Sequence, residues 1–259
     1  MQELSKTETL KKVALLCHSR LWNDEAAVAY LRDDRKLTSE TIRKFKIGLF
    51  PKDLRELFDE IDAKSLRDAG LIRHASKSPF QTRDLVLPVK DVYGNYIALV
   101  GRTRLSEEKR ERYGISKYYN TMYSKGQHLF GLDLAKRSIL ETGVAYVVEG
   151  HYDVIMPYQQ GMTNVVAVCG SNMSNRQIAL LARYTDKIVL LFDNEPKAVQ
   201  VASQIVKKKQ QEGISLTFQR PFPEGVKDLD EYLRKHSLES LREKLEEVSE
   251  FDSISPTWE

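Results

Sequence analysis

The sequence predicts an α/β fold in which a domain built on a parallel sheet follows a basic α+β region. From about residue 144 onward, short apolar runs alternate with helical patterns, which is typical of parallel strands covered by helices on both faces. Upstream of that point the chain shows amphipathic helical patterns and one hairpin pattern. With 259 residues and 41% hydrophobic content, the chain can form one large domain or two modest ones with real cores.

The front of the chain is expected to contain short helices and a β-hairpin. The stretches "NDEAAVAYLRDD" and "TSETIRKFKI" predict amphipathic helices, with N-caps at Asn23 and Thr38. Further on, "LVLPVKD" and "YGNYIALVGRTR" predict two strands of a hairpin, and the polar stretch "SEEKRERYGISK" after them is expected to be a loop.

The second half of the chain predicts four buried strands and the helices between them. The strands are expected in "VAYVV" (144–148), "NVVAVC" (164–169), "KIVLLF" (187–192) and "SLTFQ" (215–219). Helices are expected from Ser174 and from about Pro196. In sheets of this kind ligands bind beyond the carboxyl ends of the strands, so the residues that follow each strand are the candidates for a site.

The charges are unevenly distributed along the chain. Residues 1–148 hold 27 Lys and Arg against 20 Asp and Glu, whereas residues 149–259 hold 13 against 17. A basic front half and an acidic back half suit a protein that grips a polyanion with one part and holds cations with the other. Ordinary solvated faces would give the same counts, so charge alone leaves both interpretations open.

Neither the apolar runs nor the cysteines indicate a membrane or a secreted protein. The longest apolar runs, such as "KIVLLF", are far shorter than the roughly 18 residues that a membrane span needs. The two cysteines, Cys17 and Cys169, lie far apart, which indicates neither a disulfide framework nor a zinc ribbon. We therefore expect a protein of the cytoplasm.

Acidic residues follow two of the predicted strands. Glu149 and Asp153 come after "VAYVV", with Gly150 allowing a close turn, and Asp193 and Glu195 come after "KIVLLF". Like charges gathered at one sheet edge are costly unless cations lie between them, and carboxylates of this kind suit Mg²⁺ or Mn²⁺. The alternative is that each acid caps the following helix, and Asp193 fits that alternative best.

A third acidic stretch, "FPEGVKDLDEYL", places Asp228 and Asp230 beyond the "SLTFQ" strand. Together, "VVEGHYDVI" and the segment that ends in "KIVLLFDN" resemble the TOPRIM domain of bacterial DnaG-type primases, with its E-G-x-x-D and D-x-D elements. "PEGVKDLDEYL" resembles the later Asp-rich element of the same family. The resemblance implies a TOPRIM-type parallel sheet.

The resemblance extends upstream and covers roughly residues 23–236. The hairpin "LVLPVKDVYGNYIALVGRTR" is similar to the core hairpin of the primases, and "SKYYNTMYSKGQHLFGLDLAK" is similar to their nucleotide-facing basic segment. The two acidic elements alone are shared with topoisomerases and some nucleases, whereas their combination with the basic segment is typical of primases. The implied organisation is a basic subdomain (1–140), the TOPRIM domain (141–236) and a short C-terminal helix and tail (237–259).

Position by position, the resemblance implies roles for individual residues. The main metal ligands and catalytic residues are Glu149, Asp193 and Glu195, with Asp228 and Asp230 as further or outer ligands and Gly150 and Asp153 as supporting residues. The residues facing the incoming nucleotide are Lys117, Tyr118, Asn120 and Lys125. Those near the nucleic acid are Arg83, Arg102 and Arg104. A solvated loop is the alternative for the basic residues.

The implied activity is synthesis of short RNA primers on single-stranded DNA from nucleoside triphosphates, with two or more Mg²⁺ or Mn²⁺ ions and no zinc. The implied partners are a replicative helicase and a zinc-binding module on another chain, and so small a core would suit a phage. Two rivals remain. A TOPRIM nuclease would use the same acids, and a non-catalytic nucleic-acid-binding module would fit the departure at Glu195, where the family's motif has Asp. No G-x-G-x-x-G or G-x-x-x-x-G-K-[ST] motif supports a dinucleotide enzyme or a helicase motor.

Overall fold

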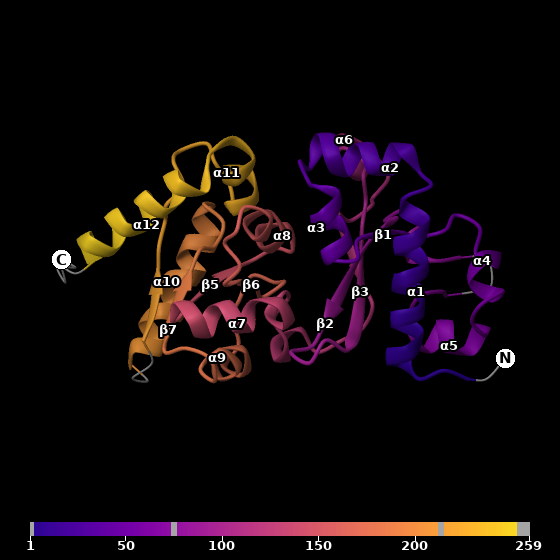
Figure 1. The fold of residues 1–259 in the computed structure, drawn as a ribbon, viewed down its shortest axis with the longest axis horizontal. Coiled ribbons are helices and arrows are strands. Elements are labelled where there is room, and N and C mark those ends of the chain that lie inside the picture. The colour runs from indigo at the N-terminus through magenta and orange to yellow at the C-terminus, as the bar shows by residue number, and fades with distance from the viewer. Residues whose placement is uncertain (1–2, 74–76, 212–214, 253–259) are drawn as a thin grey trace. The chain divides into compact units, whose positions relative to one another are not determined.

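A computed structural model describes residues 3–73, 77–211 and 215–252. The chain forms two compact units, Met1–Tyr123 and Ser124–Glu259 (Figure 1). The boundary between the two units lies upstream of helix α7 (Leu132–Thr142). The domain boundary that the sequence predicted, at 140–141, falls inside this helix. Helix α12 (Leu238–Asp252) occupies the predicted C-terminal segment, and residues 253–259 of the predicted tail lie outside the described residues.

The first unit contains an antiparallel sheet of four strands. Their order is β1 (Gly48–Leu49), β2 (Leu85–Lys90), β3 (Tyr96–Arg102) and β4 (Tyr118–Asn120). The predicted hairpin is confirmed, because β2 and β3 pair antiparallel with Leu85 opposite Arg102. At its turn, Asp91 Oδ1 accepts the amide hydrogens of Tyr93 and Asn95, both at 2.9 Å.

Helix α1 (Lys6–Leu21) packs on this sheet and supplies much of the core of the first unit. It begins in a capping box between Ser5 and Glu8. Its buried residues include Leu10, Val13 and Cys17, which belong to the same core cluster as Phe50 and Phe80 of this first unit. The helices between α1 and β2 are α2 (Glu25–Ala29), the π-helical turn η1 (Tyr30–Asp34), α3 (Ser39–Lys44), α4 (Arg55–Phe58), α5 (Ala63–Asp68) and the 3₁₀ turn η2 (Pro79–Gln81).

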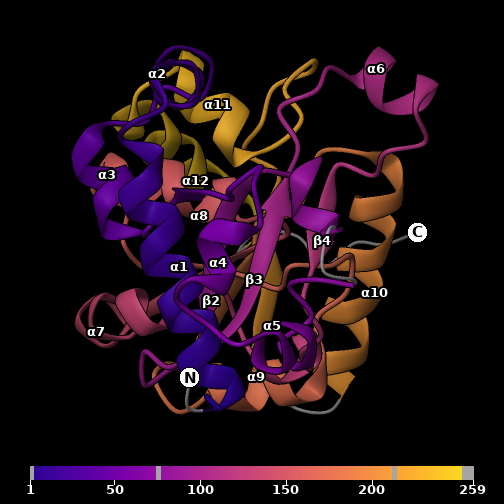
Figure 2. The ribbon, with the colours of Figure 1, turned by 90° about the vertical axis from the view of Figure 1, so that its right-hand side faces the viewer.

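Two expectations for the first unit were wrong in detail. The cap of α2 is Asp24, whose Oδ1 accepts the Ala27 amide hydrogen at 2.8 Å, and not Asn23; the cap at Thr38 is confirmed. The predicted loop after the hairpin contains a short helix, α6 (Glu107–Arg112), capped by Ser106. Figure 2 shows α6 at the end of a loop that runs beyond the ends of β3 and β4.

The second unit contains the predicted parallel sheet. Its strands are ordered β6 (Val165–Ala167), β5 (Val144–Val148), β7 (Lys187–Leu190) and β8 (Leu216–Phe218), and all three pairings are parallel. The register aligns the strand ends, since Val148 pairs with Ala167 and Leu190 pairs with both Val147 and Phe218. The carboxyl ends of the four strands therefore share one edge.

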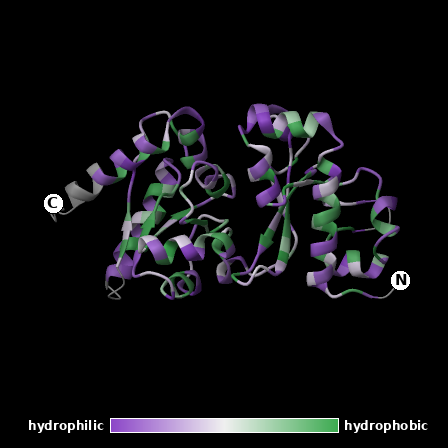
Figure 3. Ribbon diagram, in the orientation of Figure 1, coloured by the Kyte–Doolittle hydropathy of each residue, from purple (hydrophilic) through white to green (hydrophobic). Residues whose placement is uncertain are grey.

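Helices surround this sheet. They are the 3₁₀ turn η3 (Lys125–Gln127), α7, α8 (Tyr152–Gln159), α9 (Asn175–Leu181), α10 (Pro196–Gln211), α11 (Leu229–Lys235) and α12. Helix α9 begins at the predicted Ser174 cap. The central strands are predominantly apolar in Figure 3, in keeping with their burial. In the part of the chain that the structure describes, no helix is long and apolar enough to cross a membrane.

Candidate metal centre

The carboxyl edge of the parallel sheet carries the acidic residues of the second unit. Glu149 directly follows β5, and Asp193 lies in the loop after β7. The two loops are connected, because the Asp193 amide donates to Glu149 Oε1 at 3.2 Å. After β8 the chain runs through a loop to Asp228, the N-cap of α11. Three segments that are distant in sequence thus bring carboxylates to one edge.

Three of these carboxylates form a compact cluster. Asp153, Asp193 and Asp228 each offer an oxygen that lies within 4.8 Å of the oxygens offered by the other two. They come from the first turn of α8, the loop after β7 and the cap of α11. The sequence assigned Asp153 only a supporting role, yet its side chain lies inside the cluster. Its position three residues after Gly150 in the E-G-x-x-D element is the signal that pointed toward it.

Asp153 reaches this position because Gly150 has no side chain. A Cβ atom at position 150 would lie 2.5 Å from Asp153 Oδ2, much closer than two such atoms can approach. The Asp153 side chain is buried and its Oδ1 accepts the amide hydrogen of Asp230 at 3.0 Å. The glycine of the motif therefore provides the space for the carboxylate to fold back toward the strand end.

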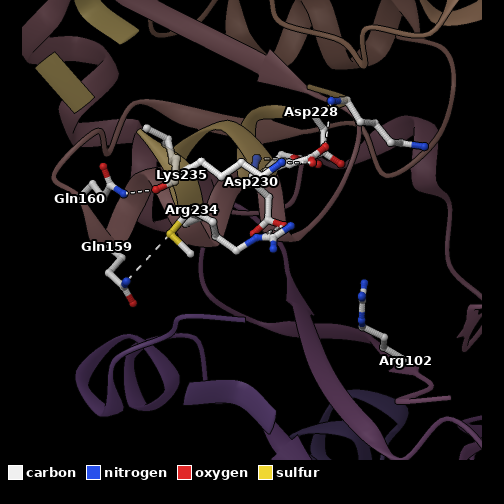
Figure 4. Close-up of polar contacts among 12 residues, drawn as sticks. Arg102, Gln159, Gln160, Asp228, Asp230, Arg234 and Lys235 are labelled. Carbon is white, nitrogen blue, oxygen red and sulfur yellow. Dashed lines mark hydrogen bonds and ion pairs between the residues drawn. The ribbon is translucent and has the colours of Figure 1, made fainter. Parts of the chain in front are cut away.

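Asp228 and Asp230 lie at the start of α11 and have different surroundings. Asp228 caps the helix by accepting the Glu231 amide hydrogen at 2.8 Å, so it serves as a cap and as a member of the cluster at the same time. Asp230 accepts a hydrogen bond from Arg234 Nε at 3.1 Å, one turn further along the helix (Figure 4). Gln160 Nε2 donates to the Leu233 carbonyl at 2.6 Å and so ties the end of α8 to α11 (Figure 4).

The electrostatics of the cluster favour a cation. The pKa of Asp193 is raised to about 7, mainly by burial and then by the neighbouring carboxylates of Glu149 and Asp228. Burial, followed by the charge of Asp228, raises the pKa of Asp153 well above its ordinary value. Burial is also the main cause of the raised pKa of Glu149 and of Asp228. Burial and mutual repulsion therefore both disfavour the ionised forms of these four carboxyl groups, and a bound cation would stabilise those forms.

One lysine partly offsets this charge. The ammonium of Lys227 donates a hydrogen bond to Glu195, and its Nζ atom lies 3.6 Å from Asp193 Oδ2. The bond to Glu195 is the main cause of the raised pKa of Lys227. Sequence reasoning overlooked this residue, although its place directly before Asp228 was the available signal.

The donor set fits a hard divalent cation. It consists of carboxylate oxygens from three elements, and their convergence within 4.8 Å is the arrangement that Mg²⁺ and Mn²⁺ accept. Glu149 adjoins the cluster through the Asp193 amide, whereas the side chains of Glu195 and Asp230 contact Lys227 and Arg234. The acidic cluster is therefore compatible with divalent metal binding.

The residues predicted to face the nucleotide are divided between the two units. Tyr118 and Asn120 lie on β4 of the first unit, directly after Lys117, whereas Lys125 lies in η3 of the second. Lys117 is exposed, and its Nζ atom lies 5.9 Å from the centroid of the Tyr118 ring. Lys125 is also exposed and donates to the Cys169 carbonyl at 3.3 Å.

The three predicted nucleic-acid-binding arginines make contacts within the first unit. Arg83 donates to the Ser116 carbonyl and hydroxyl at 3.0 and 2.9 Å. Arg104 pairs with both carboxylate oxygens of Asp84, at 3.2 and 2.5 Å. Arg102 is buried and donates to the Tyr118 hydroxyl. These contacts brace the sheet and its loops, so binding of nucleic acid by these side chains stays a prediction.

Two family models match the chain. A model of the DNA primase catalytic core, N-terminal domain, matches residues 16–136, and a Toprim-like model matches residues 146–233. The first match contains the predicted basic residues, and the second contains the whole acidic cluster. Together they confirm the TOPRIM-type sheet and the preceding α+β region.

Related proteins and solved structures agree with these matches. The DNA primase of Synechococcus elongatus is 33% identical over 255 residues, which cover 90% of this chain and 34% of that protein. The chain spans about a third to a half of the length of the curated relatives that it matches first.

Two crystal structures share the fold. The zinc-binding and RNA polymerase domains of the Aquifex aeolicus primase match with a TM-score of 0.82 and 26% identity, over 94% of this chain and 62% of that chain. The RNA polymerase domain of the Mycobacterium tuberculosis primase DnaG matches with a TM-score of 0.79 and 25% identity, over 97% and 88% of the two chains. The chain therefore belongs to the family of DnaG-type DNA primases and corresponds to their catalytic core with its Toprim domain.

Proposed function

We propose that this chain catalyses the synthesis of short RNA primers on a single-stranded DNA template. The observation that carries the proposal is the cluster of Asp153, Asp193 and Asp228 at the carboxyl edge of a Toprim-like sheet. The named relatives are DNA primases, and the chain matches about a third of the length of the Synechococcus elongatus protein. The activity of those longer proteins is thus extended here to the core that they share with this chain.

The acidic cluster is proposed to hold two or more divalent cations, Mg²⁺ or Mn²⁺. When bound, such cations lower the cost of ionising a 3′-hydroxyl and stabilise negative charge on the attacking and leaving oxygens. Asp153, Asp193 and Asp228 supply the converging oxygens. Glu149 and Glu195 are proposed as further ligands from the adjoining loops, and Asp230 as an outer partner that donates its main-chain amide hydrogen to Asp153.

The basic residues are proposed to hold the nucleotide and the nucleic acid. Lys117 and Lys125 are exposed, so their ammonium groups can reach phosphate oxygens. Tyr118 and Asn120 adjoin Lys117 on β4 and are proposed to orient the nucleotide. Arg83, Arg102 and Arg104 are proposed to form part of the surface that binds the DNA strand. The excess of basic residues in the front half of the chain is proposed to attract the phosphates of that strand.

The proposed partners are single-stranded DNA, nucleoside triphosphates, a replicative helicase and a zinc-binding module on another chain. The Aquifex aeolicus structure contains a zinc-binding domain beside its RNA polymerase domain, which supports the last of these. We propose that the protein works in the cytoplasm, at the nucleoid or, for a phage enzyme, in the host.

A single assay tests the proposal. The protein is incubated with single-stranded DNA, all four ribonucleotides and Mn²⁺, and the reaction is scored for short labelled RNA products. Template-dependent products are expected. A parallel reaction without nucleotides tests for nuclease activity. If labelled DNA is cleaved there and no RNA is made in the complete reaction, the acidic cluster supports DNA hydrolysis and not primer synthesis.

A further inference from the structure

Lys227 lies in the loop between β8 and α11, beside two of the proposed metal-binding carboxylates. Its ammonium donates to Glu195 and lies 3.6 Å from Asp193 Oδ2. The side chain is 48% exposed, so its contacts with the two acids hold it in place more than burial does. A single positive charge thus bridges both acids of the loop after β7.

The backbone of Lys227 is fixed from two directions. Its amide donates to Glu231 Oε2 at 3.0 Å, and its carbonyl accepts the amide hydrogen of Asn194 at 2.6 Å. The Asn194 side-chain amide donates to the Val226 carbonyl at 3.3 Å, and Asn194 Oδ1 accepts a hydrogen bond from Arg220 at 2.8 Å. The loop before α11 and the loop after β7 are therefore joined by bonds that do not involve the ammonium.

The ammonium is consequently not needed to hold the two loops together. Its contacts are instead with the acids whose oxygens a divalent cation requires, and the nearby Glu149 and Asp228 add further negative charge around Asp193. A divalent cation that binds Asp193 or Glu195 must compete with the ammonium for the negative charge of the same carboxylates.

We propose that Lys227 is an exchangeable counter-ion of the metal centre, which balances Asp193 and Glu195 until a divalent cation binds and which thereby lowers the affinity for that cation. The inference rests on the proposed function in one respect, namely that divalent cations bind at this cluster. It adds a residue that tunes how much metal the enzyme needs.

Binding of Mn²⁺ alone, measured by isothermal titration calorimetry without nucleotide or DNA, tests this proposal. Lys227→Met is expected to bind Mn²⁺ roughly threefold to tenfold more tightly than the wild type, because a half-exposed ammonium shared by two acids competes more strongly than an ordinary surface pair. Lys227→Arg keeps the charge and is expected to bind Mn²⁺ nearly as the wild type does.

The chain offers a matched control in Lys235. This lysine also pairs with an acid, Glu231, at 2.7 Å and one turn away on α11, and its side chain is 54% exposed. Glu231 is not one of the proposed metal ligands. Lys235→Met should leave Mn²⁺ affinity unchanged. In a Glu195→Gln background, Lys227→Met should have a smaller effect than in the wild type, because half of the competition has been removed.

The outcomes separate the inference from the proposed function. If the wild type binds Mn²⁺ and Lys227→Met binds it equally or less tightly, Lys227 does not compete with the metal and the inference fails while the proposed function stands. If the wild type does not bind Mn²⁺ at all, both fail. Should Lys227→Met not fold, as judged by circular dichroism, Lys227→Gln removes the charge while retaining a donor and decides the question in the same way.

Discussion

The absence of a side chain at Gly150 determines where one carboxylate of the acidic cluster lies. Since a Cβ atom there would lie 2.5 Å from Asp153 Oδ2, Gly150→Ala is expected to push the Asp153 carboxylate out of the cluster. Metal affinity should fall roughly tenfold or more, the loss typical of disturbed ligand positioning. Titration calorimetry with Mn²⁺ measures this loss.

Gly170→Ala is the control for this substitution, because a Cβ at position 170 meets nothing within 4 Å. It should bind Mn²⁺ as the wild type does. Unchanged Mn²⁺ affinity in Gly150→Ala would show that Asp153 is not needed for the site.

The pKa of Asp193, raised to about 7 mainly by burial, makes the stability of the metal-free protein depend on pH. The folded state holds this proton more tightly than the unfolded state does, where the pKa has its ordinary value of 3.8. The resulting stabilisation is present at low pH and is lost as pH rises through about 7. The stability of the wild type relative to Asp193→Asn should therefore decrease between about pH 4 and about pH 7 and change little above that.

Urea unfolding in the presence of a chelator measures this difference. Comparison with the variant cancels the contributions of the titrating groups that do not interact with Asp193. A difference that stays constant over this pH range, or grows as pH rises, would contradict the raised pKa of Asp193.

At the residue scale, the sequence predicted acids at one sheet edge because carboxylates followed the predicted strands. It placed Asp153 at this edge but assigned it only a supporting role, since its closeness to Asp193 and Asp228 depends on how α8 packs against α11 through contacts such as Gln160 to Leu233. It did not predict the position of Lys227, which depends on the joining of two loops that are about thirty residues apart in the sequence.

At the scale of elements, Arg104 and Asp84 close the open end of the β2–β3 hairpin. Asp84 directly precedes β2, and Arg104 follows β3 by two residues, so their paired hydrogen bonds connect the two strands beyond their last register pair. Arg104→Met should lower the free energy of unfolding by about 1–3 kcal/mol, because it leaves a partly buried carboxylate without this partner. Urea unfolding measures the loss.

The same substitution distinguishes the structural role of Arg104 from its predicted role at the nucleic acid. A variant that is as stable as the wild type but binds single-stranded DNA more weakly would assign Arg104 to the DNA and not to the hairpin.

Lys125 tests the proposed role of the η3 turn. If its ammonium holds the incoming triphosphate, Lys125→Ala should raise the nucleotide concentration needed for synthesis about tenfold or more, the worth of one charge-assisted contact of about 1.5–3 kcal/mol. Lys125→Arg should recover only part of the loss, since a planar guanidinium does not reproduce a compact ammonium.

Lys187 provides the control for this substitution. It is exposed at the amino end of β7, the opposite edge of the sheet from the acidic cluster, so Lys187→Ala should leave the nucleotide requirement unchanged. If Lys125→Ala weakened template binding and left the nucleotide requirement unchanged, Lys125 would contact the nucleic acid and not the nucleotide.

The strands were the most predictable elements, because short apolar runs bounded by helical patterns have few other interpretations. Helix α6 was missed because none of its residues is buried, so it has no apolar periodicity to detect. Its remaining signals were local ones: the Ser106 cap, glutamates in the first turn and basic residues in the last. The sequence of such a six-residue helix therefore predicts a polar loop.

At the scale of the whole molecule, the uneven charge distribution parallels the division into two units. The front half of the chain carries an excess of basic residues, and the acidic cluster lies in the second unit. Sequence composition could indicate these two tendencies. It could not place the division at Tyr123, because the η3 turn and the start of α7 join the second unit through tertiary contacts such as the antiparallel bridge between Phe130 and Ala167.

The central claim is that carboxylates at the edge of the parallel sheet support primer synthesis, and Asp193→Asn tests it most directly. The variant removes one charge from the cluster and preserves the shape of the side chain. Primer synthesis on single-stranded DNA, with four ribonucleotides and Mn²⁺, should fall below detection while circular dichroism shows a folded protein. Synthesis at the wild-type rate by the folded variant would contradict the claim.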